Sequence, residues 1–336
     1  MGSVAKAGLR APRKRSESQL RRKLPLAEEL GELLDRVELT LRESAGEQLE
    51  LGSVLDELVW TLRTHKLTQS ESEWQRTIER CRQHSVMRAL HEDPFTGRAY
   101  QKPRGYAGDA VMMDYIYGPE EGRPTPPATA LGRAIFEHFT NAPASLGVRS
   151  RRALIATHID RLVEERPGAH VLAIAAGHLR EASLSIAIRR RRTGRVVALD
   201  ADAESLEEVR ASYGAYGVET RTASFRELLT GGARDGEFDL IYSTGLFDYL
   251  PARAGRRLVA AMHRMLRPGG SLLVANFLPG IRDVGYMEAF MDWNLVYRSR
   301  QDMIDLTHAL PEAEVKNVQL WSEEALNIIF LRVTRQ

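Results

Sequence analysis

The sequence contains a single cysteine and no long apolar run, and each of these absences excludes a class of protein. Cys81 alone cannot form an internal disulfide or a zinc site built from paired cysteines. No segment approaches the roughly 20 apolar residues that a membrane-spanning helix needs. The nine histidines are scattered, so no metal site is expected. Because no apolar core follows the basic N-terminus and no disulfide is possible, we predict a cytoplasmic location.

An excess of charge of one sign is also missing, since the net charge is only +2. A nucleic-acid partner is therefore not expected. Positive charge does concentrate in residues 1–25, where eight basic side chains stand against one acid, Glu17. This composition predicts a disordered basic tail, and it leaves a targeting peptide or a contact of the tail with nucleic acid or a membrane open.

Helical periodicity dominates residues 26–145. Apolar residues recur at helical spacing in 26–43, 48–64 and 71–91. Ser70 and Glu73 form a capping-box pattern at the start of the third helix. Two more helices are expected at 128–140 and 148–165. We predict a helical N-terminal region that can also mediate a homodimer.

The stretch 93–118 interrupts this pattern because it is rich in glycine, proline and aromatic residues. We expect a loop up to Gly108, followed by a short helix through Tyr117. This glycine-rich stretch carries Tyr106 and Asp109, and we predict that it folds over a ligand site and closes it. The alternative is a structural crossover between two domains.

From His170 onward, short apolar runs alternate with helical segments. Helices are predicted at 180–191, 203–214 and 252–266, and strands at 170–175, 195–199, 218–222, 238–243, 271–276 and 327–333. This alternation predicts an α/β fold with a parallel sheet and helices on both faces, a Rossmann-like domain over 146–336. Apolar residues near Val315 and Val318 also allow an antiparallel hairpin at the sheet edge.

A nucleoside site is predicted at the carboxyl ends of the first two strands, where such sheets bind ligands. The turn Ala175-Ala176-Gly177-His178-Leu179 opens a helix and brings backbone N–H groups to a ligand. Only the middle glycine of the usual Gly-x-Gly-x-Gly loop is present. Asp200 ends the second strand, where an acid can accept hydrogen bonds from both hydroxyls of a ribose. We expect Gly177 and Asp200 to hold the same nucleoside.

The segment 238–277 carries a resemblance to a known family. The order FDLIYS followed by LRPGGSLLVANF is similar to the motif IV to motif V region of class I S-adenosylmethionine (AdoMet)-dependent methyltransferases. The resemblance covers roughly 168–336 and implies AdoMet as the cofactor. A dehydrogenase also uses glycines and an acid after its second strand, but the Pro-Gly-Gly turn and the absent third glycine argue against one.

Four segments resemble a narrower family. KPRGYAGDAVMMDYIY, GHLRE, YSTGLFDYL and DWNLVYR, at 102–117, 177–181, 242–250 and 292–298, are similar to bacterial extracellular-factor (3-hydroxypalmitic acid methyl ester biosynthesis) methyltransferases. This resemblance implies methyl transfer to the carboxylate of a 3-hydroxy fatty acid or a similar acid. Ala176 stands where many members carry Cys, a change expected to be tolerated because the backbone makes the contact.

Strand ends and resemblance together give the expected site. The residues expected to bind the cofactor are Ala175, Gly177, Glu181, Asp200, Ala201, Ser224, Phe225, Ser243 and Thr244. The residues expected to bind the substrate are Arg104, Asp109, Asn276, Trp293, Tyr297 and Arg298. The residues expected to be catalytic are Tyr106, Asp248 and Tyr249, of which the last two would serve as acid or base groups for a hydroxyl or amine acceptor. Alternatively, Arg104 and Arg298 form structural or surface contacts, and Trp293 and Tyr297 pack in the core.

The sequence thus predicts methyl transfer to a small molecule, with a carboxylate as the preferred acceptor. The first alternative is N-, O- or C-methylation of another metabolite. The second is a non-catalytic protein that binds AdoMet, an alternative that the incomplete glycine loop keeps open.

Overall fold

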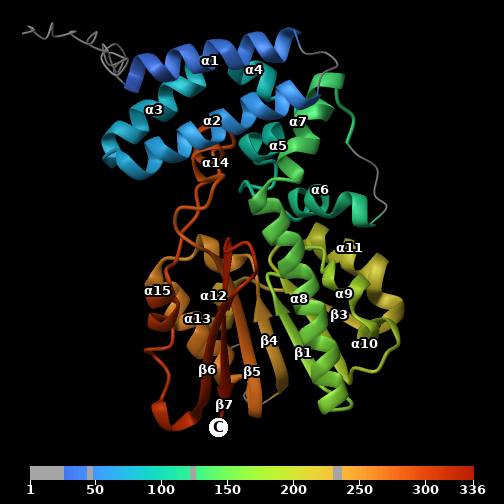
Figure 1. Ribbon diagram of the computed structural model, residues 1–336. Coiled ribbons are helices and arrows are strands. Elements are labelled where there is room, and N and C mark those ends of the chain that lie inside the picture. The colour runs from blue at the N-terminus through green and yellow to red at the C-terminus, as the bar shows by residue number, and fades with distance from the viewer. Residues whose placement is uncertain (1–25, 44–47, 122–125, 230–236) are drawn as a thin grey trace, which may run out of the picture.

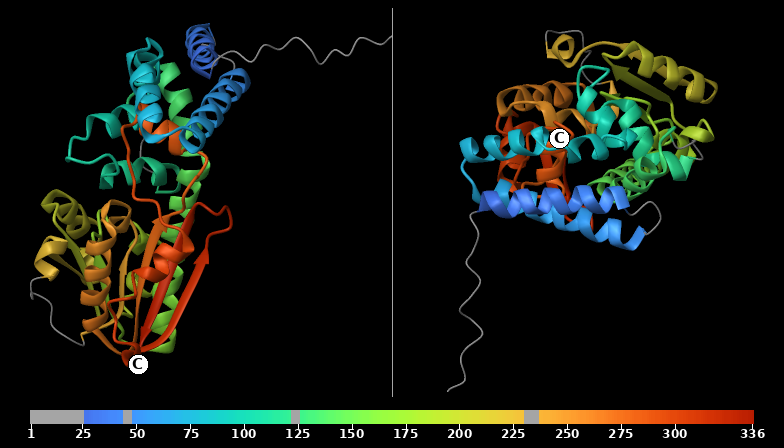
Figure 2. Two further views of the ribbon diagram at one scale, coloured as in Figure 1. Left: turned by 90° about the vertical axis from the view of Figure 1, so that its left-hand side faces the viewer. Right: turned by 90° about the horizontal axis from the view of Figure 1, so that it is seen from above.

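The computed structural model describes residues 26–43, 48–121, 126–229 and 237–336. Figure 1 shows two tiers, a sheet flanked by helices below and a group of helices above it. The chain ends at the lower edge of the sheet, and the two tiers stay distinct in the side view of Figure 2. The predicted basic tail, residues 1–25, lies outside the described residues.

A seven-stranded sheet forms the lower tier, in the order β3-β2-β1-β4-β5-β7-β6. The strands are β1 (His170–Ile174), β2 (Arg195–Asp200), β3 (Val218–Thr222), β4 (Phe238–Ser243), β5 (Leu266–Phe277), β6 (Val315–Ser322) and β7 (Ile328–Arg335). The first five strands are parallel, while β7 pairs antiparallel with both β5 and β6. The α/β class, the parallel sheet and the edge hairpin predicted from the sequence are confirmed.

Helices cover both faces of the sheet because each strand directs alternate side chains to opposite sides. One face packs on α8 (Pro143–Glu165), α9 (Glu181–Leu184), α10 (Ile186–Arg189) and α11 (Ala203–Tyr213). The other face packs on α12 (Phe225–Leu229), α13 (Ala252–Arg264) and α15 (Arg300–Asp305). Single 3₁₀ turns lie at η1 (Gly214–Tyr216), η2 (Leu246–Tyr249) and η3 (Glu312–Glu314).

Two predicted features of the lower tier differ in detail. The helix expected over 180–191 is divided at Ser185, whose hydroxyl caps α10 and donates to Asp160. The Pro-Gly-Gly turn lies inside β5 as an irregularity rather than before the strand, and the register with β4 shifts there. Gly269 has a φ of 73°, and a Cβ on Gly270 would lie 3.0 Å from the Phe238 carbonyl oxygen, so both positions need glycine.

The upper tier contains the N-terminal helices and one helix from the C-terminal half. Its members are α1 (Leu26–Glu43), α2 (Gln48–Thr68), α3 (Glu71–Gln83), α4 (Val86–Leu90), α5 (Pro94–Gln101), α6 (Ala110–Glu121), α7 (Ala130–Thr140) and α14 (Val284–Phe290). The expectation of a loop up to Gly108 is wrong for α5. Asp93 accepts hydrogen bonds from the backbone N–H groups of Phe95 and Thr96, and Pro94 occupies the first turn, so a short helix forms there.

Helix α14 joins the two tiers. After β5 the chain rises to the N-terminal helices, and Figure 1 shows this orange helix against the blue α2. Glu288 of α14 accepts a hydrogen bond from Trp74 Nε1 at 2.7 Å and pairs with Lys66 Nζ at 2.8 Å. Helix α8 runs through the position where the sequence places the boundary between the two regions, 145/146. The upper tier is therefore built from both halves of the chain.

Replacing Gly285 with alanine is expected to destabilise the protein. The backbone of α14 at Gly285 lies so close to the backbone of α2 that no side chain fits between them. An alanine methyl group would lie 2.6 Å from the Leu62 carbonyl oxygen and 2.7 Å from the Arg63 nitrogen. We expect Gly285→Ala to lower the free energy of unfolding by about 1–3 kcal/mol, as measured by guanidinium titration. Gly31→Ala in α1 is the matched control, since no atom lies within 4 Å of its added methyl group. Equal effects of the two changes would contradict this account of the contact.

Candidate functional site

A cavity of about 610 Å³ lies where β1, β2 and β4 end. Strand order reverses between β1 and β4, so the cavity occupies the switch point at which α/β sheets bind ligands. Its lining comes from both tiers. The upper tier contributes Tyr106, Gly108, Ala110, Met113 and Tyr117. We call this cavity the strand-tip pocket.

The turn after β1 keeps the backbone of a glycine-rich loop although two of the three glycines are missing. Ala175, Gly177 and Leu179 have φ angles of 53°, 52° and 51°. A side chain in this region costs on the order of 1 kcal/mol or more, so the surroundings must hold the turn. The Ala176 N–H donates to the Leu199 carbonyl oxygen at 3.1 Å, and a Cβ on Gly177 would lie 3.3 Å from that of Ala110. The second strand and the upper tier thus fix the loop from both sides.

Asp200 ties the tips of β1 and β2 together. Its Oδ2 accepts a hydrogen bond from the Gly177 N–H at 2.8 Å, and its Oδ1 accepts one from the Asp202 N–H at 2.9 Å. Each carboxylate oxygen can accept more than one hydrogen bond, so both retain capacity toward the pocket. The sequence predicts that Gly177 and Asp200 bind one ligand. In the structure these two residues are in direct contact at the edge of the strand-tip pocket.

Most of the other expected cofactor residues also line the strand-tip pocket: Ala175, Glu181, Ala201, Ser224, Phe225 and Thr244. The Ser224 hydroxyl accepts from the Glu227 N–H at 3.4 Å, and the Glu227 carboxylate accepts from the Ser224 N–H at 2.7 Å, so the pair caps the start of α12. Ser243 is fully buried, and its hydroxyl has no partner among the described residues. Ser243 is absent from the pocket lining.

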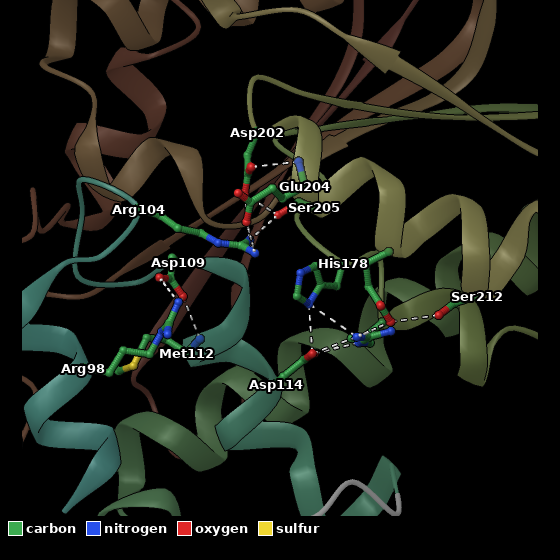
Figure 3. A network of polar contacts seen from close by, with 12 residues as sticks. Arg98, Arg104, Asp109, Met112, Asp114, His178, Asp202, Glu204, Ser205 and Ser212 are labelled. Carbon is green, nitrogen blue, oxygen red and sulfur yellow. Dashed lines mark hydrogen bonds and ion pairs between the residues drawn. The ribbon is translucent and has the colours of Figure 1, made fainter. Parts of the chain in front are cut away.

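Two groups of ion pairs attach the upper tier to the cofactor end of the pocket, as Figure 3 shows. In the first, Arg104 Nη1 binds Asp202 at 2.7 Å and Ser205 at 2.9 Å, and Nη2 binds Glu204 at 3.1 Å. Arg104 therefore pairs with the start of α11. Asp109, also expected in the site, accepts from Arg98 Nη2 at 2.7 Å and from the Met112 N–H at 2.9 Å, so it caps α6.

The second group centres on Asp114 of α6. Its carboxylate accepts from Arg180 Nε at 2.6 Å and contacts His178 Nδ1 at 2.9 Å, while Arg180 Nη2 also binds Glu208 at 2.9 Å. Burial alone would raise the pKa of Asp114, but the hydrogen bonds from Arg180 and His178 outweigh it and hold that pKa well below its usual range. An upper-tier carboxylate thus fixes the helix that follows the glycine loop.

The acceptor end of the pocket is mainly aromatic. Trp293 Nε1 donates to the Tyr249 hydroxyl at 2.8 Å, and the Tyr106 ring meets the Tyr249 ring edge-on at 5.8 Å. A Cβ on Gly108 would lie 2.5 Å from the Tyr249 hydroxyl, so this close approach requires glycine. Burial raises the pKa values of both tyrosines, which stay protonated. The structure brings Tyr106, Tyr249 and Trp293 together as the sequence predicts.

Asp248 lies beside these aromatic rings and is 3% exposed. Its Oδ1 accepts a hydrogen bond from the Phe277 N–H at 2.9 Å. Burial raises the pKa of Asp248 to about 7, although Arg151, the Phe277 N–H and Arg298 act in the opposite direction. The carboxyl group is therefore poised to change protonation near neutral pH.

Of the residues expected to bind the acceptor, only Trp293 lines the pocket, while Arg104, Asp109, Asn276, Tyr297 and Arg298 do not. Arg298 and Asn276 instead hold the backbone next to it. Arg298 donates to the Phe247 and Leu250 carbonyl oxygens and to Asn276 Oδ1, each at 2.5 Å. Asn276 Nδ2 donates to the Val296 carbonyl oxygen at 2.8 Å. The buried Tyr297 hydroxyl has no partner among the described residues.

Sequence reasoning missed several polar residues of the pocket, among them Arg151 and Tyr242. Arg151 lies in the middle of α8, in a helical stretch where neither spacing nor composition distinguishes it from the other arginines. Tyr242 lies within the apolar run of β4, and its hydroxyl donates to Glu181 Oε1 at 2.5 Å. A polar residue inside a predicted buried strand is the one signal that could have identified Tyr242.

Replacing Asp114 with asparagine is expected to loosen the contact between the tiers, because it leaves the buried Arg180 without its main anion. We expect Asp114→Asn to lower the free energy of unfolding by about 3 kcal/mol at pH 7. The lowered pKa of Asp114 stabilises the fold above pH ~4, and this contribution is lost as the pH falls. The difference from the parent protein should therefore shrink in denaturant titrations at pH 3. Glu204→Gln, which removes an exposed partner of Arg104, should cost less than about 1 kcal/mol.

Comparison with known proteins agrees with this geometry. A family model described as a methyltransferase domain matches residues 171–270. No curated protein matches the sequence. A solved structure from Bordetella parapertussis, named as a possible exported protein, is similar with a TM-score of 0.55 at 16% identity, over 93% of this chain and 97% of that one. That similarity shows the fold, and it extends over both tiers.

Shorter similarities also occur. The N-methyltransferase NodS from Bradyrhizobium japonicum, in complex with S-adenosyl-L-homocysteine, has a TM-score of 0.41 at 16% identity, over 58% of this chain and 89% of its own. Magnesium protoporphyrin IX methyltransferase from Synechocystis, with bound AdoMet, has a TM-score of 0.41 at 15% identity, over 57% and 84%.

The domain match covers β1 through the first part of β5, which includes the glycine loop, Asp200 and the pocket residues that follow β1 to β4. The pocket residues of the upper tier, Arg151 and Trp293 lie outside the match. Residues 171–270 therefore form a methyltransferase domain, and the chain is an AdoMet-dependent methyltransferase with the class I fold.

Proposed function

We propose that the protein transfers a methyl group from AdoMet to the carboxylate of a small, largely apolar acid, such as a 3-hydroxy fatty acid. One observation carries the proposal, namely the burial of Arg151 in the pocket lining, where it lies between the Thr244 carbonyl oxygen at the tip of β4 and apolar residues. A buried guanidinium in an apolar wall suits a ligand that combines a carboxylate with an apolar body.

The nucleoside of AdoMet is assigned to the tips of β1 and β2. The Gly177 turn presents backbone N–H groups, Asp200 can accept from the ribose hydroxyls, and Phe225 offers an apolar surface for the adenine. Glu181, Tyr242 and Thr244 are assigned to the methionine end because they line the pocket next to this turn. When bound, the cofactor would supply a methyl group on a sulfonium. A nucleophile in line with the carbon–sulfur bond would take the methyl group, and S-adenosylhomocysteine would be the leaving group.

The residues at the acceptor end suit a nucleophile that needs no base. A carboxylate is already ionised at neutral pH, so the protein has to remove water from it and align it. Tyr106, Tyr249 and Trp293 exclude water from this end, while Arg151 can orient the acid. A second cavity of about 30 Å³ lies behind Phe277 and Trp293, among Phe139, Tyr286 and Met291. This second cavity is too small for the body of the acid, which has to lie in the 610 Å³ strand-tip pocket.

A second candidate function follows from Asp248. A carboxyl group with a pKa of about 7 can accept a proton from a hydroxyl or an amine at neutral pH. This observation favours O- or N-methylation of a neutral or cationic metabolite. The two candidates differ in their product, since only a methyl ester is labile to mild base.

Two further expectations stay predictions, the cytoplasmic location and a dimer through the N-terminal helices. Within the described ranges, no helix has both the length and the apolarity to cross a membrane.

The proposed acceptor is tested by methyl transfer from labelled AdoMet to a panel of fatty acids, 3-hydroxy fatty acids, amines and alcohols. We expect label in the acids, released as methanol by mild base. Base-stable label in an amine or alcohol would replace the first candidate by the second. If AdoMet neither binds nor raises the melting temperature, the chain does not act as an enzyme.

Asp200→Asn is expected to weaken binding of S-adenosylhomocysteine, because the neutral amide is a poorer acceptor for ribose hydroxyls and for the Gly177 N–H. We expect a loss of about 1–3 kcal/mol in calorimetric titration. Asp202→Asn is the matched control, since Asp202 pairs with Arg104 and does not line the pocket. An unchanged affinity of the Asp200 variant would show that the ribose lies elsewhere.

A further inference from the structure

Arg151 is a buried cation whose contacts leave part of its guanidinium available. It lies on α8 and is 6% exposed. Its Nη1 donates to the Thr244 carbonyl oxygen at the tip of β4, and its Nη2 lies 3.9 Å from Met113 Sδ, a weak acceptor. The guanidinium also contacts the Tyr117 hydroxyl, and the Glu181 carboxylate, held by Tyr242, lies within its electrostatic reach. Both Thr244 and Met113 line the strand-tip pocket with it. The guanidinium therefore faces the place where cofactor and acceptor meet.

The acid nearest to Arg151 is Asp248, but the pair is loose. Asp248 Oδ2 lies 3.9 Å from Arg151 Nη1, beyond hydrogen-bond distance, while its Oδ1 is occupied by the Phe277 N–H. The other groups that face Asp248 are Arg298 and the hydroxyls of Tyr249 and Tyr297. Arg298 makes its close contacts with carbonyl oxygens and Asn276. Asp248 thus only partly neutralises Arg151.

We propose that Arg151 and Asp248 form a carboxylate-binding site, in which a ligand carboxylate binds the Arg151 guanidinium and Asp248 takes up one proton from solvent. The inference rests on the proposed function and deepens it. The carboxylate comes either from the methionine part of the cofactor or from the acceptor acid. The two carboxylates would bind a guanidinium in the same way, and each would enter the pocket beside Thr244.

Proton uptake follows from electrostatics. Two carboxylates that share one guanidinium in a buried site repel each other, so binding of the second favours the protonated form of the first. Burial has already raised the pKa of Asp248 to about 7. At pH values below 7 the site is ready for an anion, whereas above 7 the ligand has to draw a proton from solvent. Affinity for a carboxylate should therefore fall about tenfold per pH unit above pH 7.

Binding calorimetry with two nucleosides tests the role of Arg151. S-adenosylhomocysteine carries the methionine-type carboxylate, and 5′-methylthioadenosine is a similar thioether without it. A third titration uses a 3-hydroxy fatty acid in the presence of S-adenosylhomocysteine. We expect Arg151→Gln to lower the affinity for one of the two carboxylate ligands at least tenfold and to leave the affinity for 5′-methylthioadenosine unchanged. Loss confined to S-adenosylhomocysteine assigns the site to the cofactor, and loss confined to the fatty acid assigns it to the acceptor.

Arg149→Gln is the matched control, because Arg149 lies on the same helix, donates to the Ile116 carbonyl oxygen and to Asn141, and is not in the pocket lining. It should leave all three affinities within about twofold. Unchanged 5′-methylthioadenosine binding in Arg151→Gln also shows that this variant is folded.

Asp248→Asn tests the coupled proton without removing Arg151. The amide oxygen can still accept from the Phe277 N–H, and the neutral side chain imitates the protonated acid. In this variant, affinity for the carboxylate ligand should not change between pH 6 and 8.5, and it should exceed that of the parent protein about tenfold at pH 8. A parent protein with no pH dependence would overturn the coupling.

The outcomes separate this inference from the proposed function. If Arg151→Gln changes no affinity, the carboxylate site is wrong, even if the parent protein methylates fatty acids. If no acid is methylated but S-adenosylhomocysteine loses affinity in Arg151→Gln, the acceptor proposal fails and the carboxylate site stands.

Discussion

The hydrogen bond from the Gly177 N–H to the Asp200 carboxylate is the contact on which the site depends. It joins the tips of β1 and β2 at the edge of the pocket and fixes the turn that follows β1. The same carboxylate accepts from the Asp202 N–H, so it also sets the start of α11, where Arg104 attaches the upper tier. One acid thus fixes the turn after β1 and the start of the helix that Arg104 binds.

The upper tier does more than cover the pocket. Asp114 binds Arg180 and His178, which follow the glycine loop, and Ala110 packs against Gly177 itself. Ala175 and Leu179 have left-handed backbone conformations, which residues other than glycine avoid in a free chain. The contacts with the upper tier hold the loop in this conformation, whereas glycines at these two positions would adopt it without strain. The incomplete loop motif and the tightly bound upper tier belong to one arrangement.

The sequence was sufficient for the sheet because buried parallel strands are read from apolar runs, and β3 and β4 have the predicted bounds. It was also sufficient for residues at strand tips, such as Asp200 and Thr244, whose position follows from topology. It failed where a role depends on distant partners. Arg298 and Asn276 hold backbone next to the pocket, whereas Arg151 faces into it from a helix that no motif marks. Helix α5 was missed because its glycine and tyrosine content obscured the Asp93 cap.

The return of α14 to the N-terminal helices has a consequence for engineering. Tyr286 and Phe290 are almost fully buried there, and Phe139 of α7 stacks on Tyr286 at 3.9 Å. A fragment that begins near residue 146 would carry this helix without its partners and expose aromatic surface to solvent. Chimaeras that exchange the N-terminal helices should therefore exchange α14 with them, because α14 packs on α2, α3 and α7.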